Sequence, residues 1–220
     1  QFARGEDTVS RRFGCLGIGN LAIVTANHQE LFDSGAIASL LPLAVCDDLE
    51  TRRCTAFGLN NVASNEKNHR VLERMGVLRP LVALIKDKDQ DTHLQACLAV
   101  RQLSLTPKCR FQFVEMKGLQ PLLALADSDS IEVQRELAAA LRNLSLSEQN
   151  KISIVREGGM DVLIKFAHSL DVEIAHQSCG VLANLAEALE NQGPMIETGL
   201  LQHLKYVLRS KSVDVQREAV

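Results

Sequence analysis

Apolar residues recur along the chain in blocks separated by short polar stretches, and their spacing inside the blocks is that of α-helices. Residues 150–185 illustrate the pattern. The run KISIVRE predicts a short first helix that begins at Asn150 and is stopped by Gly158 and Gly159. MDVLIKFA predicts a second helix, because its apolar residues have helical spacing. VEIAHQSCGVLANLA is apolar or small on most faces, which predicts a long third helix surrounded by protein.

This three-helix pattern repeats along the chain. One marker is a glycine-led phrase, anchored at Gly35, Gly76, Gly118, Gly159 and Gly199. A second marker is an amide near the end of each third helix, at Asn20, Asn61, Gln102, Asn143 and Asn184. Both markers give a period close to 41 residues, so we predict a single repeat array over residues 1–220. Its expected parts are a partial repeat (1–26), full repeats (27–67, 68–108, 109–149, 150–190) and an incomplete repeat (191–220), truncated at both ends.

Two local features receive structural interpretations. An asparagine recurs where the first helix begins, at Asn27, Asn68, Asn150 and Asn191. We expect each of these side chains to cap its own first helix. The glycine-rich stretch FGCLGIGNLA resembles a phosphate-binding loop, but the repeat alignment places it inside a third helix with no strand before it. Its glycines are therefore predicted to let neighbouring helices pack closely.

A period near 41 residues, three helices per unit, the glycine break and the (N/Q)(L/V)(A/S) motif together resemble the armadillo repeat. A HEAT array is the nearest alternative, but the glycine and the recurrent asparagine favour armadillo. The resemblance implies an all-α, right-handed superhelical solenoid of about five repeats whose third helices line a concave groove. It also implies protein–protein interaction, because such arrays are similar to catenins, importin-α and vacuolar-anchor scaffolds.

The resemblance implies a peptide-binding role for the third-helix amides. In similar arrays this asparagine binds the backbone of an extended peptide, and the matching positions are Asn20, Asn61, Asn143 and Asn184, with Gln102 as a longer substitute. The alternative, that some of these amides bond to the neighbouring repeat, stays open. Importin-α-like arrays carry tryptophan one turn earlier, where this chain has Leu16, Phe57, Leu98, Ala139 and Gly180. Nuclear-signal binding is therefore disfavoured, and Phe57 either floors an apolar pocket or packs against a neighbouring helix.

A basic stripe is predicted two turns before the amides. It comprises Arg12, Arg53, Arg135, His176 and Arg217, with Leu94 as an interruption, and Arg101 and Arg142 lie next to it. Aspartates gather in the loops before the third helices, at Asp47, Asp48, Asp87, Asp89, Asp127 and Asp129. We expect a locally basic groove and a ligand with acidic and apolar side chains. The alternative is an ordinary solvated surface.

Composition and motifs exclude several function classes. A net charge of -3 and 4% aromatic residues argue against nucleic-acid binding, and no apolar run is long enough to span a membrane. The six cysteines have no metal-binding spacing and indicate a reducing, intracellular setting. We find no nucleophile with its base, no metal-ligand set and no catalytic carboxylate pair, and therefore expect no catalytic site, no metal and no cofactor.

These observations predict a non-enzymatic, cytoplasmic scaffold or adaptor that binds extended peptide segments of other proteins in its groove. The main alternative is a structural scaffold that is tethered to a membrane or to the cytoskeleton, through its convex face or through parts outside this chain. Binding of nuclear localisation signals, as by an import receptor, is the less favoured hypothesis.

Overall fold

The computed structural model describes residues 7–207. These residues form α-helices and short 3-10 helices, and no strand occurs among them. The chain divides into two compact units, Gln1–Cys109 and Arg110–Val220. The predicted single array and its repeat bounds stay predictions.

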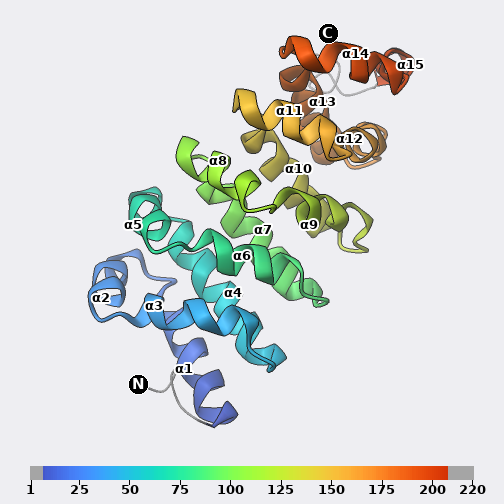
Figure 1. Cartoon of the computed structure of the whole chain (residues 1–220). Coiled ribbons are helices and arrows are strands. Elements are labelled where there is room, and N and C mark those ends of the chain that lie inside the picture. The colour runs from blue at the N-terminus through green and yellow to red at the C-terminus, as the bar shows by residue number, and fades with distance from the viewer. Residues whose placement is uncertain (1–6, 208–220) are drawn as a thin grey trace. The chain divides into compact units, whose positions relative to one another are not determined.

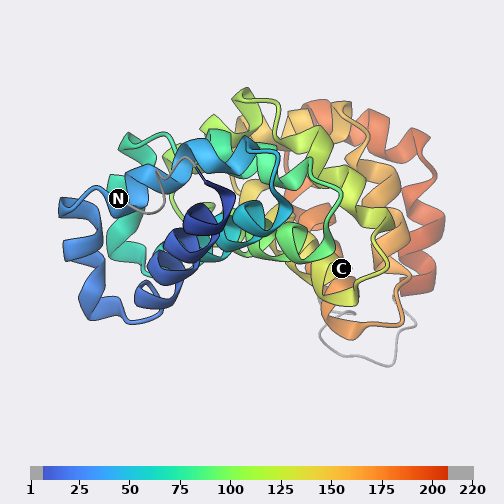
Figure 2. The same ribbon diagram turned by 90° about the horizontal axis from the view of Figure 1, so that it is seen from below.

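The first unit shows the expected order of helices (Figure 1). Its third helices are α1 (Thr8–Leu21), α4 (Leu49–Ala63) and α7 (Gln90–Leu103). Its first helices are α2 (His28–Asp33), preceded by η2 (Thr25–Asn27), and α5 (His69–Arg74), preceded by η4 (Glu66–Asn68). Its second helices are α3 (Ala36–Leu40), continued by η3 (Leu41–Val45), and α6 (Leu78–Ile85). α4 packs against both α1 and α7, and Figure 2 shows α1 in dark blue beside α4 in cyan.

The second unit repeats this order. Its third helices are α10 (Ile131–Leu144) and α13 (Val172–Ala186). Its first helices are α8 (Pro107–Glu115), which begins just before the unit boundary, α11 (Glu148–Arg156) and α14 (Leu189–Glu197). Its second helices are α9 (Leu119–Leu123), continued by η5 (Ala124–Asp127), α12 (Gly159–Ala167) and α15 (Leu200–Val207). α13 packs against α10 and α12.

The third helices supply much of the buried core. One of their columns consists only of small residues, each fully shielded from solvent: Cys15, Ala56, Cys97, Ala138 and Cys179. Small side chains let adjacent third helices approach, and the bulky residues beside them fill the remaining space. The burial predicted for Cys15, Cys97 and Cys179 is confirmed, and all six cysteines are free thiols.

The turn after each first helix contains one left-handed residue. Positive φ angles occur at Gly35, Gly76, Lys117, Gly158 and Gly199. Each of these positions lies 41 residues after the one before it. The predicted alignment of Gly118 and Gly159 with the other anchor glycines is therefore wrong by one position. In the third repeat a lysine occupies the left-handed position, where glycine avoids the steric penalty.

Gly118 and Gly159 instead form a second column of glycines, which is required by packing. A Cβ atom on Gly118 would lie 2.7 Å from Cζ of Phe113 and 2.8 Å from the Phe113 carbonyl oxygen. A Cβ atom on Gly159 would lie 2.6 Å from the carbonyl oxygen of Ile154. The absence of a side chain thus lets the chain fold back tightly on the end of the first helix.

The recurrent asparagine of the first helix has a different role from the one expected. Asn150 and Asn191 lie inside α11 and α14, and Asn27 and Asn68 make no side-chain capping bond to their own helices. Each side-chain amide donates to a carbonyl oxygen six residues earlier: Asn27 to Leu21 (3.0 Å), Asn68 to Val62 (2.8 Å), Asn150 to Leu144 (3.1 Å) and Asn191 to Leu185 (3.0 Å). The capping prediction is therefore wrong. These amides close the preceding third helix, whose last carbonyls have no partner within the helix.

The next residue closes the same helix end in three repeats. His28 Nε2 donates to the Ala22 carbonyl oxygen at 2.7 Å, and His69 Nε2 donates to that of Ala63 at 2.8 Å. Gln192 Nε2 makes the corresponding bond to Ala186 at 3.2 Å. In the first unit the contact also joins neighbouring repeats, because Asn68 Nδ2 lies 2.7 Å from His28 Nδ1.

Candidate functional site

The candidate site is the exposed side of the third helices within each unit. Each described third helix begins with a capping side chain that accepts a bond from the backbone N–H three residues later. The caps are Asp7, Asp48, Asp89, Ser130 and Asp171, with N···O distances of 2.7, 2.9, 2.9, 3.2 and 3.1 Å. An anionic side chain here also interacts favourably with the helix dipole. The start of each described third helix is therefore fixed by a side chain of its own cap.

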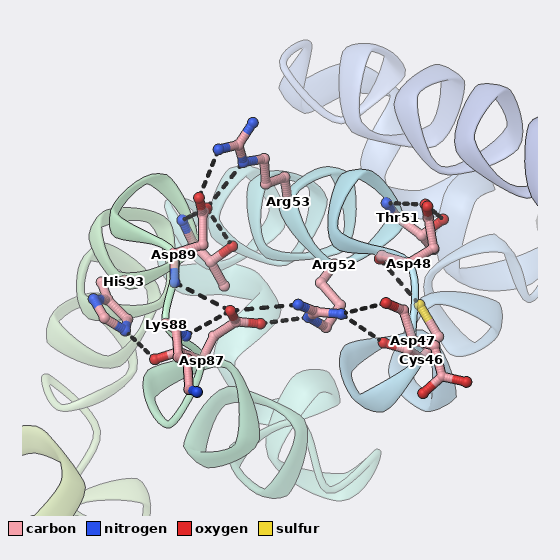
Figure 3. A network of polar contacts seen from close by, with 11 residues as sticks. Cys46, Asp47, Asp48, Thr51, Arg52, Arg53, Asp87, Lys88, Asp89 and His93 are labelled. Atoms are coloured by element: carbon pink, nitrogen blue, oxygen red, sulfur yellow. Dashed lines mark hydrogen bonds and ion pairs between the residues drawn. The ribbon is translucent and has the colours of Figure 1, made fainter.

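The three described arginines of the predicted basic stripe are bound to these capping aspartates. The pairs, each 36 residues apart, are Arg12 with Asp48, Arg53 with Asp89, and Arg135 with Asp171. Arg53 binds in a fork, with Nε 2.9 Å from one carboxylate oxygen of Asp89 and Nη2 2.6 Å from the other (Figure 3). Its Nη1 also donates to Glu50 at 2.9 Å. Each pair joins one third helix to the start of the next.

These pairs are electrically balanced. Hydrogen bonds from Arg12 and Arg53 hold the pKa of Asp48 and of Asp89 well below the usual aspartate value. The bond from Arg135 lowers the pKa of Asp171 in the same way. Both members of each pair therefore stay charged near neutral pH, and an acidic ligand has to compete with a fixed carboxylate.

A signal in the sequence identifies this pairing, although the stripe prediction did not use it. At Arg12, Arg53 and Arg135 an aspartate follows 36 residues later. Where the stripe has Leu94 or His176, the residue 36 positions later is a serine, Ser130 or Ser212. Arginine and aspartate thus occur together or are absent together. Ser212 and Arg217 lie outside the described residues.

The loops before the third helices are held by side chains from the helices that follow them. Arg52 Nη1 donates to the Cys46 carbonyl oxygen at 2.9 Å, and Arg52 also pairs with Asp87 (Figure 3). At the equivalent position of α7, His93 Nε2 donates to the Asp87 carbonyl oxygen at 2.6 Å. In α10, Gln134 Nε2 makes the corresponding bond to Ser128 at 2.7 Å. Arginine, histidine and glutamine therefore hold the loop in the same way in three repeats. Because the residue type differs, comparing the repeats by residue type does not reveal the shared role.

Two of the predicted peptide-binding amides bond to the adjacent repeat. Asn61 Nδ2 donates to the Gly19 carbonyl oxygen at 3.0 Å, and Asn184 Nδ2 donates to Ser145 Oγ at 2.8 Å. Both side chains are half-buried. A carboxamide has a second N–H and two carbonyl lone pairs, so one bridging bond does not exhaust it. The alternative that these amides bond to the neighbouring repeat is thus correct for one bond of Asn61 and one of Asn184. That bond fixes the orientation of each amide.

The remaining predicted positions are placed as follows. Asn20 is exposed on α1, and Gln102, Asn143 and His176 are half-buried on α7, α10 and α13. Like Asn61 and Asn184, these four residues therefore lie on third helices.

Phe57 and Arg142 each cover a glycine of an adjacent third helix. A Cβ atom on Gly19 would lie 2.7 Å from Cδ1 of Phe57, so the ring occupies the space that this glycine leaves. In the second unit the Arg142 guanidinium lies in the same way against Gly180. Phe57 therefore packs against a neighbouring helix, as one of its two interpretations expects, while its side chain stays half-exposed.

Among residues 7–207, no group of three or more histidine, cysteine, aspartate or glutamate residues is placed to hold a metal ion. Over the same part of the chain, no helix is both long and apolar enough to cross a membrane.

Comparisons with known proteins add to this geometry. The Armadillo/beta-catenin-like repeat family matches residues 106–146 and 147–187. No curated protein matches the chain. Computationally designed armadillo repeat proteins for modular peptide recognition match with a TM-score of 0.91, covering 100% of this chain and 94% of theirs at 22% identity.

Two further solved structures are similar. A designed armadillo repeat protein in complex with the peptide (KR)4 has a TM-score of 0.87 and covers 100% of this chain and 94% of its own at 23% identity. An engineered protein has the same TM-score and 25% identity, with 99% of this chain and 90% of its own covered. The all-α armadillo solenoid of about five repeats is thereby confirmed, while its superhelical hand stays a prediction. Residues 106–187 thus match two repeats of the Armadillo/beta-catenin-like family, and the chain has the fold of armadillo repeat solenoids.

Proposed function

We propose that the protein is a non-enzymatic scaffold that binds an extended segment of another protein along its third helices. The observation that carries this proposal is the pair of oriented, half-buried amides, Asn61 and Asn184, each held by a bond to the adjacent repeat. Two further points support it: the armadillo family match, and the peptide bound by a designed armadillo protein of the same fold.

Amide orientation matters because a peptide backbone offers alternating donors and acceptors. An asparagine whose Nδ2 is already anchored loses little conformational freedom when a ligand binds. Each net hydrogen bond contributes about 0.5–1.5 kcal/mol, so useful affinity needs several amides in a row. Asn20, Gln102 and Asn143 are the proposed further members of that row.

The proposed ligand has acidic and apolar side chains, and the apolar contacts carry more of its affinity. Phe57 offers a half-exposed ring beside Asn61. The charges of Arg12, Arg53 and Arg135 are balanced by aspartates, so an acidic ligand side chain gains little at these positions. We therefore expect the affinity to depend only weakly on salt concentration.

The test begins with peptides selected from a displayed library on the unaltered protein. Their dissociation constants are then measured for Asn61→Ala, Asn184→Ala and, as a control on the first-helix surface, Gln29→Ala. Losing one net bond predicts a 2- to 10-fold weaker affinity for each asparagine variant, roughly, and no change for the control. Equal affinities for all variants that remain folded would refute peptide binding at this surface and favour the tethering alternative, through other faces.

We also propose a cytoplasmic location. The six free cysteines, three of them in one fully buried column, support a reducing compartment. Attachment to a membrane or to the cytoskeleton would then occur through a bound partner.

A further inference from the structure

Two histidines meet in the second unit although 35 residues separate them. His168 follows the end of α12, and His203 lies in α15, which packs against α12. Nε2 of His168 is 2.9 Å from Nδ1 of His203, and the ring planes are inclined by 77° with centroids 5.1 Å apart. The two residues occupy different positions within the 41-residue period, so the repeat alignment does not reveal the pair.

We propose that His168 and His203 form a two-imidazole binding site for a divalent transition-metal ion that prefers ligands at right angles, such as Ni²⁺ or Cu²⁺. Imidazole nitrogens bind such ions at about 2.0–2.1 Å. In the square-planar geometry of these ions, two nitrogens at that distance in adjacent positions are about 2.9 Å apart. The observed separation of 2.9 Å therefore matches chelation without any movement of the two helices.

The proton balance permits this exchange. In the hydrogen bond one ring donates an N–H and the other accepts it. For both facing nitrogens to bind an ion, the donor ring transfers this proton to its far nitrogen by exchange with water, and the ion takes its place. No net proton is released when both rings are neutral. The exposed position of His168 leaves its ring accessible to water and to the ion.

The remaining ligands of the ion would be water. No third histidine, cysteine, aspartate or glutamate completes a cluster within the described residues. Its affinity comes from chelation, because binding to the second ring is intramolecular once the first ring is bound. Occupation would join the second helices of two consecutive repeats and stabilise the folded state.

Three of the other described histidines are poorer ligands. His28 and His69 are only 3% exposed, and each donates from Nε2 to a carbonyl oxygen. His93 is likewise bonded through Nε2 to the Asp87 carbonyl oxygen. His93 is therefore a suitable control, since it is a half-buried single imidazole in the first unit.

Isothermal titration with NiCl₂ tests the proposal on the unaltered protein and on His168→Ala, His203→Ala and His93→Ala. We expect one ion per chain, with affinity at least about tenfold weaker in the first two variants and unchanged in the third. NiCl₂ should also raise the unfolding temperature of the unaltered protein but not of His168→Ala. Absence of binding, or equal affinity in His168→Ala, would overturn the proposal. Because His168 is exposed, that variant decides the matter even if His203→Ala proves unstable.

Discussion

Replacing Lys117 by glycine is expected to stabilise the protein. Lys117 has a φ of 58°, whereas the same turn position in the other described repeats is glycine with φ between 72° and 87°. The left-handed conformation costs an L-residue about 1–2 kcal/mol. Glycine avoids this cost but loses about 0.5–1 kcal/mol more conformational freedom on folding. The free energy of unfolding should therefore rise by about 0.5–1 kcal/mol.

The reverse change provides a matched control. Gly76 has a φ of 72°, and no atom lies within 4 Å of the position where a Cβ would be built, so Gly76→Ala introduces backbone strain without a collision. It should lower stability by a similar amount. Urea unfolding followed by circular dichroism compares the midpoints, and an unchanged slope would show that the cooperative unit is the same. A lower midpoint for Lys117→Gly at an unchanged slope would refute the assignment of strain to this turn.

Three further perturbations follow from the same contacts. No atom lies within 4 Å of a Cβ built on Gly17, so the close-packing role predicted for this glycine is wrong, and Gly17→Ala should stabilise by about 1 kcal/mol through its helix propensity. Gly159→Ala should destabilise, because its Cβ would collide with a carbonyl oxygen, and equal shifts in unfolding temperature for the two variants would contradict this. Asn150→Ala should lower the free energy of unfolding, measured by urea titration, by about 1–3 kcal/mol, because its amide donates to two main-chain carbonyl oxygens. An unchanged free energy would contradict the proposal that Asn150 closes the preceding third helix. The bond from Arg53 lowers the pKa of Asp89, so the stability that this carboxylate contributes is present above about pH 4 and is lost as the pH falls further. The free energy of unfolding of Asp89→Asn should therefore depend less on pH in the acid range. A pH dependence identical to that of the unaltered protein would contradict this.

The repeat architecture was predictable because its signal is local and redundant. The small column from Cys15 to Cys179 recurs every 41 residues, and burial of a third helix requires such residues whatever its exact neighbours are. The anchor glycines were less reliable, because two adjacent columns need glycine for different reasons. Gly158 supplies a left-handed turn, Gly159 supplies space, and Lys117 shows that residue identity alone does not mark the turn.

Side-chain partners were harder to predict, because they depend on how the repeats stack. Asn150 stands where a capping residue belongs in sequence, yet stacking brings its amide back to the end of the preceding third helix. Arg53 looks like a free cation in sequence, but its partner Asp89 is 36 residues away. The joint occurrence of arginine and aspartate at this spacing was the available signal. No periodic signal marks His168 and His203, because the two residues occupy different repeat positions.

The most direct measurement of the central claim is an NMR titration of the protein, with isotope-labelled asparagine side chains, by a peptide selected on it. We expect the side-chain amide resonances of Asn61 and Asn184 to shift and to saturate together with the binding curve. The resonance of Asn27, whose amide closes a helix end, should not move. Saturation by the peptide with unchanged Asn61 and Asn184 resonances would contradict a binding surface on the third helices.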